Sequence, residues 1–448
     1  MVAPAVVIAA PASGSGKTTV ATGLIGALRA AGHRVAPFKV GPDYVDPGYH
    51  TLAAGRPGRN LDPVLAGEHR IGPLYAHGST GCDVAVVEGV MGLFDGRSGG
   101  GSSGPGHGST AHVAALLGAP VILVVDARGQ ARSIAALLHG FATFDPSVRL
   151  AGVVLNRVGS ARHEEILRDA CADAGLTVLG ALPRHRELAV PSRHLGLVTA
   201  VEHGTAATSA VTAMTDLVAQ HLDLAAVRAL AATTVTTAAW NPADVVGQAA
   251  TNRPVVAVAG GGAFTFGYAE HVELLAAAGA QVVTVDPLHD KVLPEHTRGL
   301  VLPGGFPEEH AAALADNTGL LHAVRALAET GAPVHAECGG LLYLARELEG
   351  HRLAAVLDAV GEFSPRLTLG YREAVALSDS ALHRAGERVS GHEFHRTVVR
   401  PAAGAAKAWG WSGSTEGYVQ AGVHASYLHT HPAGAPKAVA RFVAACAR

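Results

Sequence analysis

The chain contains 448 residues, more than one ordinary hydrophobic core accommodates, so we expect two or more domains. Its content of 48% hydrophobic and 16% charged residues excludes the disordered and fibrous classes. The 34 Lys and Arg residues against 37 Asp and Glu give a formal net charge of −3, which argues against nucleic acid or an anionic membrane as the main partner.

The cysteines and the apolar runs indicate the compartment. The four cysteines lie far apart and form no CxxC pair, which predicts neither a disulfide framework nor a zinc ribbon and favours a reducing environment. The longest apolar run, from Val113 to Val125, is too short for a membrane helix and contains Gly118 and Pro120. No basic segment precedes the N-terminal apolar stretch, so no signal peptide is predicted. We expect a cytoplasmic protein without a membrane segment.

Short β-branched runs alternate with Ala- and Leu-rich helical stretches along the whole chain. This alternation is typical of βαβ units and predicts an α/β fold with parallel sheets. The predicted strands are Ala5–Ala9, Val84–Val87, Val121–Val125, Ala151–Leu155, Val255–Ala259, Gln281–Val285, Gly299–Leu302 and Ala332–Ala336, with a further strand around Val35.

Two segments interrupt this pattern. Between Ala225 and Arg253, Thr, Ala, Asn and Pro accumulate without a clear period, and we place the domain boundary there, with domains at 1–245 and 253–448. The segment from Gly96 to Ser109 is so rich in Gly and Ser that we expect a mobile loop.

The first predicted strand is followed by APASGSGKTTV and then by a helix, as in a P-loop. In such a loop backbone N–H groups surround the phosphates, the lysine neutralises their charge and the next hydroxyl binds Mg²⁺. Lys17 and Thr18 suit these last two roles, although Pro11 stands where the P-loop consensus has Gly. A Gly-rich turn with an exposed lysine is the alternative. The candidate nucleotide-binding residues are Ser13, Gly14, Ser15, Gly16, Lys17, Thr18 and Thr19.

A magnesium–nucleotide site also needs carboxylates, because this hard cation prefers oxygen ligands. Glu88 ends a predicted strand at the edge where open α/β sheets bind ligands, and it is our candidate metal carboxylate. Lys39, Asp43 and Asp46 follow another strand in a turn fixed by Pro and Gly. An ordinary surface turn has the same composition, so their spacing leaves both interpretations open.

A second group of reactive residues lies in the C-terminal half. Cys338 is predicted at a turn between a strand and a helix, beside two glycines. A helix N-terminus there lowers the pKa of a thiol, which makes Cys338 the candidate nucleophile, with a buried structural cysteine as the alternative. Its base can be any of three histidines in one segment, and backbone N–H groups of Gly305 and Gly339 are candidates for an oxyanion hole. The three histidines are His424, His429 and His431.

Together these residues resemble the glutamine-dependent amidoligases of corrinoid biosynthesis, and most closely the cobyrinic and hydrogenobyrinic acid a,c-diamide synthases. The resemblance covers nearly the whole chain. It rests on eight blocks in family order: GPDYVDPGYH (41–50), NLD (60–62), EGVMGLFDG (88–96), PSRHLGL (191–197), LPGGFPE (302–308), AECGGLLYL (336–344), GHEFHRT (391–397) and ASYLHTH (425–431).

The resemblance implies a P-loop NTPase domain similar to dethiobiotin synthetase, followed by a class I glutamine amidotransferase-like α/β domain. It implies a ligase that uses ATP, Mg²⁺ and L-glutamine to amidate hydrogenobyrinic or cobyrinic acid. It selects His429 as the base of Cys338. Since His431 stands where related triads have an acid, it implies a Cys–His dyad without an acidic partner.

The same resemblance assigns the remaining roles. Thr18, Asp43 and Glu88 would hold Mg²⁺, whereas Lys17 and Lys39 would face the phosphates or an acyl phosphate. The expected contacts with the ring substrate or the nucleotide base are Asp46 near the substrate carboxylate, Arg193 and His194 in a basic cluster, and Asn156 at the base. A homodimer is plausible for such an enzyme. The alternatives are cobyric acid synthase, which amidates other side chains of the ring, and, in a different class, a partition-type P-loop ATPase switch.

Overall fold

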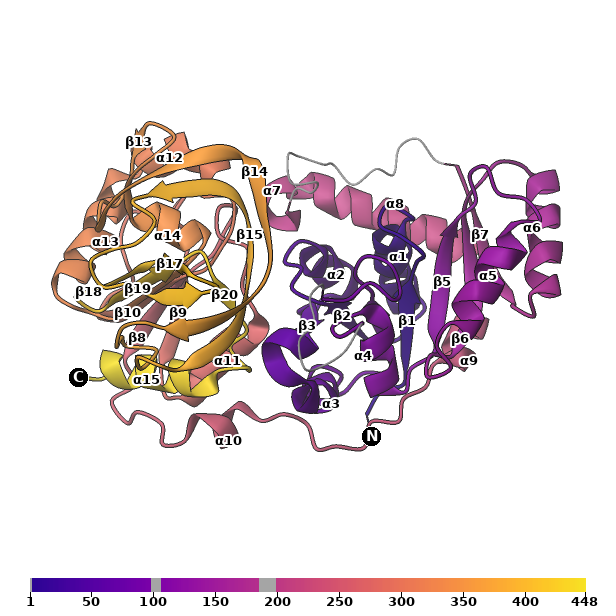
Figure 1. Ribbon diagram of the computed structural model, residues 1–448, viewed down its shortest axis with the longest axis horizontal. Helices are drawn as coiled ribbons and strands as arrows, with labels where there is room; N and C mark the ends of the chain where they lie inside the picture. The colour runs from indigo at the N-terminus through magenta and orange to yellow at the C-terminus, as the bar shows by residue number, and fades with distance from the viewer. Residues whose placement is uncertain (1, 98–105, 185–198) are drawn as a thin grey trace. The chain divides into compact units, whose positions relative to one another are not determined.

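A computed structural model describes residues 2–97, 106–184 and 199–448 and divides the chain into two compact units, Met1–Trp240 and Asn241–Arg448 (Figure 1). None of the helices in these described ranges combines the length and the apolar character that a membrane span requires.

The N-terminal unit is built on one parallel sheet of seven strands, in the order β3-β2-β4-β1-β5-β6-β7. Its central strands are apolar and fully buried, as expected when helices cover both faces. The strands are β1 Ala5–Ala9, β2 Val35–Val40, β3 Arg59–Leu61, β4 Val84–Glu88, β5 Val121–Asp126, β6 Leu150–Val158 and β7 Val178–Pro183.

Helices α1 to α6 connect successive strands, α7 to α9 follow the last strand, and α1 packs against both α2 and α8. They are α1 Lys17–Ala30, α2 Asp46–Ala54, α3 Glu68–Gly78, α4 Thr110–Leu117, α5 Ile134–Thr143, α6 Ala161–Asp173, α7 Ala200–His203, α8 Thr205–His221 and α9 Leu224–Leu230, with a π-helical turn at Pro63–Gly67.

The C-terminal unit has two sheets. The first has the order β18-β19-β11-β10-β8-β9 and is parallel except for the pair β18–β19. Its strands are β8 Val255–Ala259, β9 Gln281–Val285, β10 Thr297–Leu302, β11 Val334–Glu337, β18 Tyr418–Gln420 and β19 Val423–Ser426. The helices of the unit are α10 Pro242–Val246, α11 Ala269–Ala277, α12 Ala311–Asp316, α13 Thr318–Glu329, α14 Gly339–Leu344 and α15 Pro436–Cys446, with a 3₁₀ turn at Pro307–His310.

The second sheet is mainly antiparallel and is dominated by the long pair β14–β15, which Figure 1 shows as a curved ribbon. Its strands are β12 Ala345–Leu348, β13 His351–Arg352, β14 Leu357–Ala376, β15 Arg388–Arg400, β16 Trp409–Trp411, β17 Ser414–Glu416 and β20 His429–Thr430. The α/β class is confirmed, but the expectation of parallel sheets alone missed this second sheet. Its strands are partly exposed and carry many polar residues, so they lack the apolar runs of buried parallel strands.

Candidate functional site

The loop between β1 and α1 is shaped by two glycines in left-handed conformations, Gly14 with φ 78° and Gly16 with φ 101°. Gly16 precedes α1, which has no side-chain N-cap, so the first N–H groups of the helix are open to an anion. A Cβ on Gly16 would lie 2.2 Å from Asn156 Nδ2 and would displace this amide, and the left-handed φ would strain any side chain at this position. The loop therefore has the geometry of a phosphate cradle.

Two side chains fix this cradle. Asn156, at the end of β6, donates from Nδ2 to the carbonyl oxygen of Ser15 at 2.8 Å. Ser15 Oγ in turn donates to Ala12 O at 2.9 Å. The amide of Asn156, expected at the nucleotide base, thus supports the loop backbone. Ser13 and Gly14 are exposed, whereas Thr19 is half-buried on the first turn of α1.

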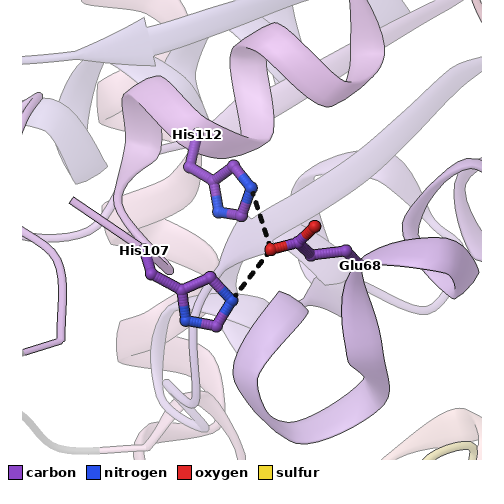
Figure 2. Close-up of side chains that lie close together, drawn as sticks. All are labelled: Glu68, His107 and His112. Atoms are coloured by element: carbon purple, nitrogen blue, oxygen red, sulfur yellow. Dashed lines mark ion pairs between the residues drawn. The ribbon is translucent and has the colours of Figure 1, made fainter. Parts of the chain in front are cut away.

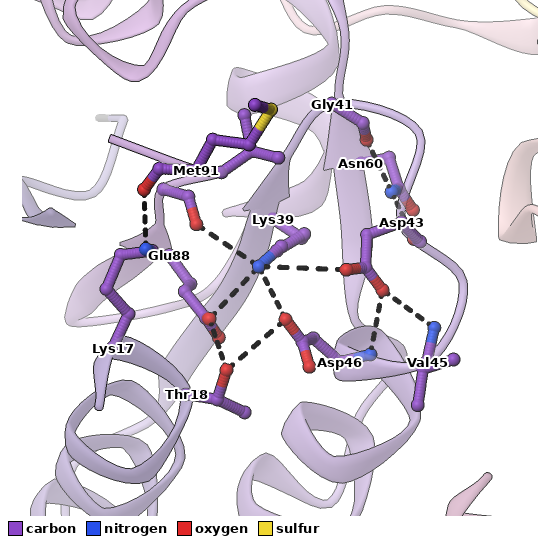
Figure 3. Close-up of polar contacts among 12 residues, drawn as sticks. Lys17, Thr18, Lys39, Gly41, Asp43, Val45, Asp46, Asn60, Glu88 and Met91 are labelled. Atoms are coloured by element: carbon purple, nitrogen blue, oxygen red, sulfur yellow. Dashed lines mark hydrogen bonds and ion pairs between the residues drawn. The ribbon is translucent and has the colours of Figure 1, made fainter. Parts of the chain in front are cut away.

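The ammonium group of Lys17 lies over the same loop, where Nζ donates to Met91 O at 2.5 Å (Figure 3). Burial, followed by the charge of Lys39, lowers the pKa of Lys17. A phosphate that replaced the Met91 carbonyl would relieve both effects, since it would supply negative charge.

Behind the cradle, a buried cluster joins Thr18, Lys39, Asp46 and Glu88 (Figure 3). Thr18 Oγ1 donates to Glu88 Oε1 at 2.7 Å and lies 3.4 Å from Asp46 Oδ2. Lys39 Nζ reaches Asp46 Oδ2 at 2.5 Å, Glu88 Oε1 at 3.0 Å and the carbonyl oxygen of Gly89 at 3.1 Å. The structure thus brings together residues from α1, β2, α2 and β4 that the sequence placed in separate segments.

Charge and burial oppose each other in this cluster. Burial disfavours the charge on Lys39, but the surrounding carboxylates outweigh it and raise the pKa of Lys39. Burial would likewise raise the pKa of Glu88, yet Lys39 and a hydrogen bond with His50 lower it. The pKa of Asp46 is raised by burial and by the charges of Asp43 and Glu88. Together with Asp43 and Lys17, the carboxylates around this cluster outnumber the ammonium groups by three to two.

These residues fit a magnesium ion. The hydroxyl of Thr18 and the carboxylates of Asp46 and Glu88 are oxygen donors of the kind that Mg²⁺ prefers. Asp46 Oδ1 is buried and has no hydrogen-bond partner among the described residues, and a cation at this point would favour the ionised form of Asp46. Asp43, the other expected ligand, uses Oδ1 to accept from the backbone N–H groups of Val45 and Asp46 at the start of α2.

Two supporting residues were missed by the sequence interpretation. His50 lies wholly buried on α2, with Nε2 2.7 Å from Glu88 Oε2. Asn60 donates from Nδ2 to the carbonyl oxygens of Gly41 and Asp43, which fixes the turn that carries Asp43 (Figure 3). Both belong to blocks already singled out for the family resemblance, and their polar side chains beside glycine turns were the available signal.

In the C-terminal unit, Cys338 stands between β11 and α14 with φ 48° and ψ −101°. A positive φ is unfavourable for a residue with a Cβ and is typical of a nucleophile held on a sharp turn. The neighbouring strand β19 fixes this turn, since Cys338 N donates to Ser426 O at 2.7 Å. The side chain is 3% exposed.

The expectation of a lowered thiol pKa was wrong. Burial, followed by the negative charge of Glu308, raises the pKa of Cys338, and the N–H of Gly339 counteracts this only in part. At neutral pH the resting group is therefore a thiol rather than a thiolate, and attack on a substrate requires a base.

His429 is the expected base. It lies on β20 and is fully buried, and its ring contacts Gly304, where a Cβ would come within 2.3 Å of Cε1. A hydrogen bond joins the sequence neighbours of the two catalytic candidates. Thr430 N, next to His429, donates to Oε1 of Glu337, the residue before Cys338, at 3.1 Å. Burial lowers the pKa of His429 to about 4, so the imidazole is neutral and able to accept a proton.

The other two candidate histidines pack elsewhere. His424 on β19 meets Trp409 edge-on, with ring centroids 5.3 Å apart. The ring of His431 lies 4.3 Å from that of Tyr268, and its Nδ1 accepts from Ala433 N.

The candidate oxyanion groups adjoin each other. A Cβ on Gly339 would lie 2.9 Å from the backbone nitrogen of Gly305 and 2.9 Å from Pro307 Cδ. Glycine at 339 therefore lets the peptide group of Gly305 approach the turn of Cys338, which is the arrangement that two N–H donors for one oxyanion need.

The expected absence of an acidic neighbour of His429 was also wrong. Glu337 Oε2 lies 3.9 Å from His429 Nδ1. Because the resemblance drew attention only to the position two residues after His429, which is His431, it overlooked the residue before Cys338.

Arg193, His194 and residues 98–105 of the Gly-rich segment lie outside the described residues. Next to that segment, Glu68 Oε1 lies 3.2 Å from His107 Nε2 and 3.5 Å from His112 Nε2 (Figure 2). The N–H of Gly108 donates to His112 Nδ1, so the ring proton of neutral His112 sits on Nε2 and faces Glu68. This tautomer favours a hydrogen-bonded contact over a metal site.

Family models match both units. Residues 6–198 match the CobQ/CobB/MinD/ParA nucleotide binding domain, and residues 255–436 match the CobB/CobQ-like glutamine amidotransferase domain. The chain is therefore a two-domain, glutamine-dependent amidating ligase in which a nucleotide-binding P-loop domain precedes a glutaminase-type domain.

Curated relatives specify the family. A hydrogenobyrinate a,c-diamide synthase of Mycobacterium bovis is 63% identical over 98% of this chain and 97% of the relative. A hydrogenobyrinate a,c-diamide synthase of Streptomyces coelicolor is 56% identical over 99% of this chain and 97% of the relative. A cobyrinate a,c-diamide synthase of Gloeobacter violaceus is 44% identical over 99% and 97%. The chain belongs to the a,c-diamide synthase family of cobalamin biosynthesis.

Proposed function

We propose that the protein amidates the a and c acetate carboxylates of hydrogenobyrinic acid with nitrogen from glutamine and energy from ATP. The observation that carries this proposal is the conjunction of a P-loop carboxylate cluster with a cysteine–histidine site in a full-length match to enzymes of that name. The cobalt-free ring is favoured because relatives named for hydrogenobyrinate are 51% to 63% identical, whereas those named for cobyrinate are 40% to 44% identical.

The N-terminal site activates the carboxylate. A carboxylate is a poor electrophile, so the γ-phosphoryl group of ATP is first transferred to it, giving an acyl phosphate and ADP; ammonia then attacks the carbonyl carbon and releases phosphate. The backbone of the P-loop holds the phosphates, and Lys17 and Lys39 offset the charge on the transferred group. Thr18, Glu88 and Asp46 would hold Mg²⁺, which would supply positive charge to offset that of the phosphates.

The C-terminal site supplies the ammonia. His429 removes the proton from the Cys338 thiol, and the sulfur attacks the side-chain amide carbon of glutamine. The N–H groups of Gly305 and Gly339 stabilise the oxyanion, and the proton on His429 passes to the leaving nitrogen. Water then hydrolyses the thioester to glutamate and restores the thiol.

The test is mass spectrometry of hydrogenobyrinic acid and of cobyrinic acid after incubation with ATP, Mg²⁺ and glutamine. We expect the wild-type protein to form the diamide of hydrogenobyrinic acid. Cys338→Ala forms it only when ammonium replaces glutamine, and the matched control Cys82→Ala, at a half-buried thiol of the other unit, behaves as wild type. Diamide formation from glutamine by Cys338→Ala contradicts the proposal.

A further inference from the structure

Glu337 occupies an unusual position, between the nucleophile and its base. It is the last residue of β11, directly before Cys338, and its Oε2 lies 3.9 Å from His429 Nδ1. The side chain is only 12% exposed. At this distance the two groups are an ion-pair contact rather than a hydrogen bond, and catalytic hydrogen bonds are often long without substrate and tighten when it binds.

The other oxygen of this carboxylate is firmly anchored. Glu337 Oε1 accepts from Thr430 N at 3.1 Å and from Thr430 Oγ1 at 2.9 Å, and it lies 3.4 Å from His335 Nε2. Burial alone would raise the pKa of Glu337, but the hydrogen bond with His335 and the nearby imidazoles lower it to about 2. The group is thus a fixed anion at neutral pH.

We propose that Glu337 is the positioning residue of a Cys338–His429–Glu337 triad, in which the acid comes from the residue before the nucleophile. This inference rests on the proposed glutaminase function of the site. Glu337 holds the proton of neutral His429 on Nδ1, which leaves the lone pair of Nε2 for the thiol of Cys338. It also stabilises the imidazolium that forms when the thiol loses its proton.

The environment of His429 makes such a partner necessary. Because the ring is fully buried, its charged form is strongly disfavoured, and a nearby anion is required to compensate. The titratable groups that act on the ring come from two strands: Glu337 and His335 on β11, and His392, Glu393 and His395 on β15. Glu337 lies at ion-pair distance from His429.

The decisive variant is Glu337→Gln. Since Thr430 donates two hydrogen bonds to Oε1, the oxygen of the new amide stays with Thr430, and its NH₂ group turns toward His429 Nδ1. An N–H donor at that point favours the wrong tautomer, with the proton on Nε2. We expect kcat for glutamine hydrolysis to fall about 10²- to 10⁴-fold with little change in KM, as expected when the acid of such a triad becomes an amide.

The tautomer itself is the readout that a purely structural role does not move. Long-range ¹H–¹⁵N spectra of histidine-labelled protein, assigned with His429→Asn, should show Nδ1–H in the wild type and in Glu337→Asp, and Nε2–H in Glu337→Gln. Glu337→Asp keeps the charge and should recover part of kcat. Glu329→Gln, at an exposed position on α13, is the matched control.

The outcomes separate this inference from the proposed function. A wild-type protein that hydrolyses no glutamine refutes the function. If the wild type is active, two results for Glu337→Gln refute the triad. The first is an unchanged kcat. The second is an unchanged tautomer of His429 together with a loss of kcat that follows a loss of Tm. The Tm of each variant, compared with that of the wild type, reports whether the unit that carries Glu337 is folded.

Discussion

The packing of Gly304 against His429 predicts a selective loss of glutamine use in Gly304→Ala. The new Cβ would lie 2.3 Å from Cε1 and 3.2 Å from Nε2 of His429, and 3.2 Å from the Cβ of Phe266. Ordinary contacts are 3.4 to 4 Å, so the ring has to retreat by roughly 1 Å. Such a displacement of a catalytic group costs about 10²-fold in rate, and overpacking costs about 1–3 kcal/mol of stability. Because the φ of Gly304 is not positive, backbone strain adds nothing to this effect.

The assay compares amidation supported by glutamine with amidation supported by ammonium in the same preparation. We expect the glutamine-dependent rate of Gly304→Ala to fall about 10²-fold and the ammonium-dependent rate to stay at the wild-type value. Gly267→Ala is the matched control, since a Cβ at this exposed position meets nothing within 4 Å. A wild-type glutamine-dependent rate in Gly304→Ala, or an equal loss of both rates, would refute the reasoning.

Three further predictions follow from charge and burial. Glu88→Gln keeps one acceptor oxygen but removes the negative charge beside Thr18 and Lys39, so ammonium-dependent phosphate release should fall at least about 10²-fold while glutamine hydrolysis persists. Equal loss of both activities contradicts this assignment. Burial lowers the pKa of His271 and of His383 from 6.5 to about 4, so as the pH falls the unfolded chain takes up these protons before the folded chain does. The free energy of unfolding should therefore fall between pH 6.5 and pH 4, by on the order of 3 kcal/mol for each group. Urea unfolding at several pH values tests this, and a free energy that does not change with pH contradicts it. Since burial raises the pKa of Cys338, the rate of its alkylation by iodoacetamide should be low at pH 7 and should still rise beyond pH 9. Peptide mass spectrometry measures this rate, and a plateau near neutral pH would indicate a preformed thiolate.

The sequence predicted the elements that local chemistry determines. Most of the buried apolar strands of the N-terminal sheet and of the first C-terminal sheet were predicted because continuous β-branched runs admit few alternatives, and β1, β8 and β9 have the predicted bounds. The shorter or less apolar strands β3, β7, β18 and β19 were not predicted. The P-loop and the turn of Cys338 were predicted because glycines mark backbone conformations that other residues avoid.

Features that depend on contacts between distant segments could not be predicted in this way. The long pair β14–β15 alternates polar and apolar residues irregularly, and its register is fixed by pairing rather than by local pattern. The raised pKa of Cys338 arises from burial by the surrounding fold, whereas the sequence shows only the adjoining helix. Similarly, the approach of Glu337 to His429 depends on Thr430, a residue 93 positions away in sequence.

The central claim is that nitrogen released at Cys338 becomes the amide nitrogen formed at the P-loop site. Its most direct test is the mass of the diamide made from hydrogenobyrinic acid, ATP, Mg²⁺ and glutamine labelled with ¹⁵N at the side-chain amide. The account predicts that both new amides carry ¹⁵N in the wild-type product and that Cys338→Ala yields no labelled product. Unlabelled diamide from the wild-type protein, or labelled diamide from Cys338→Ala, would contradict it.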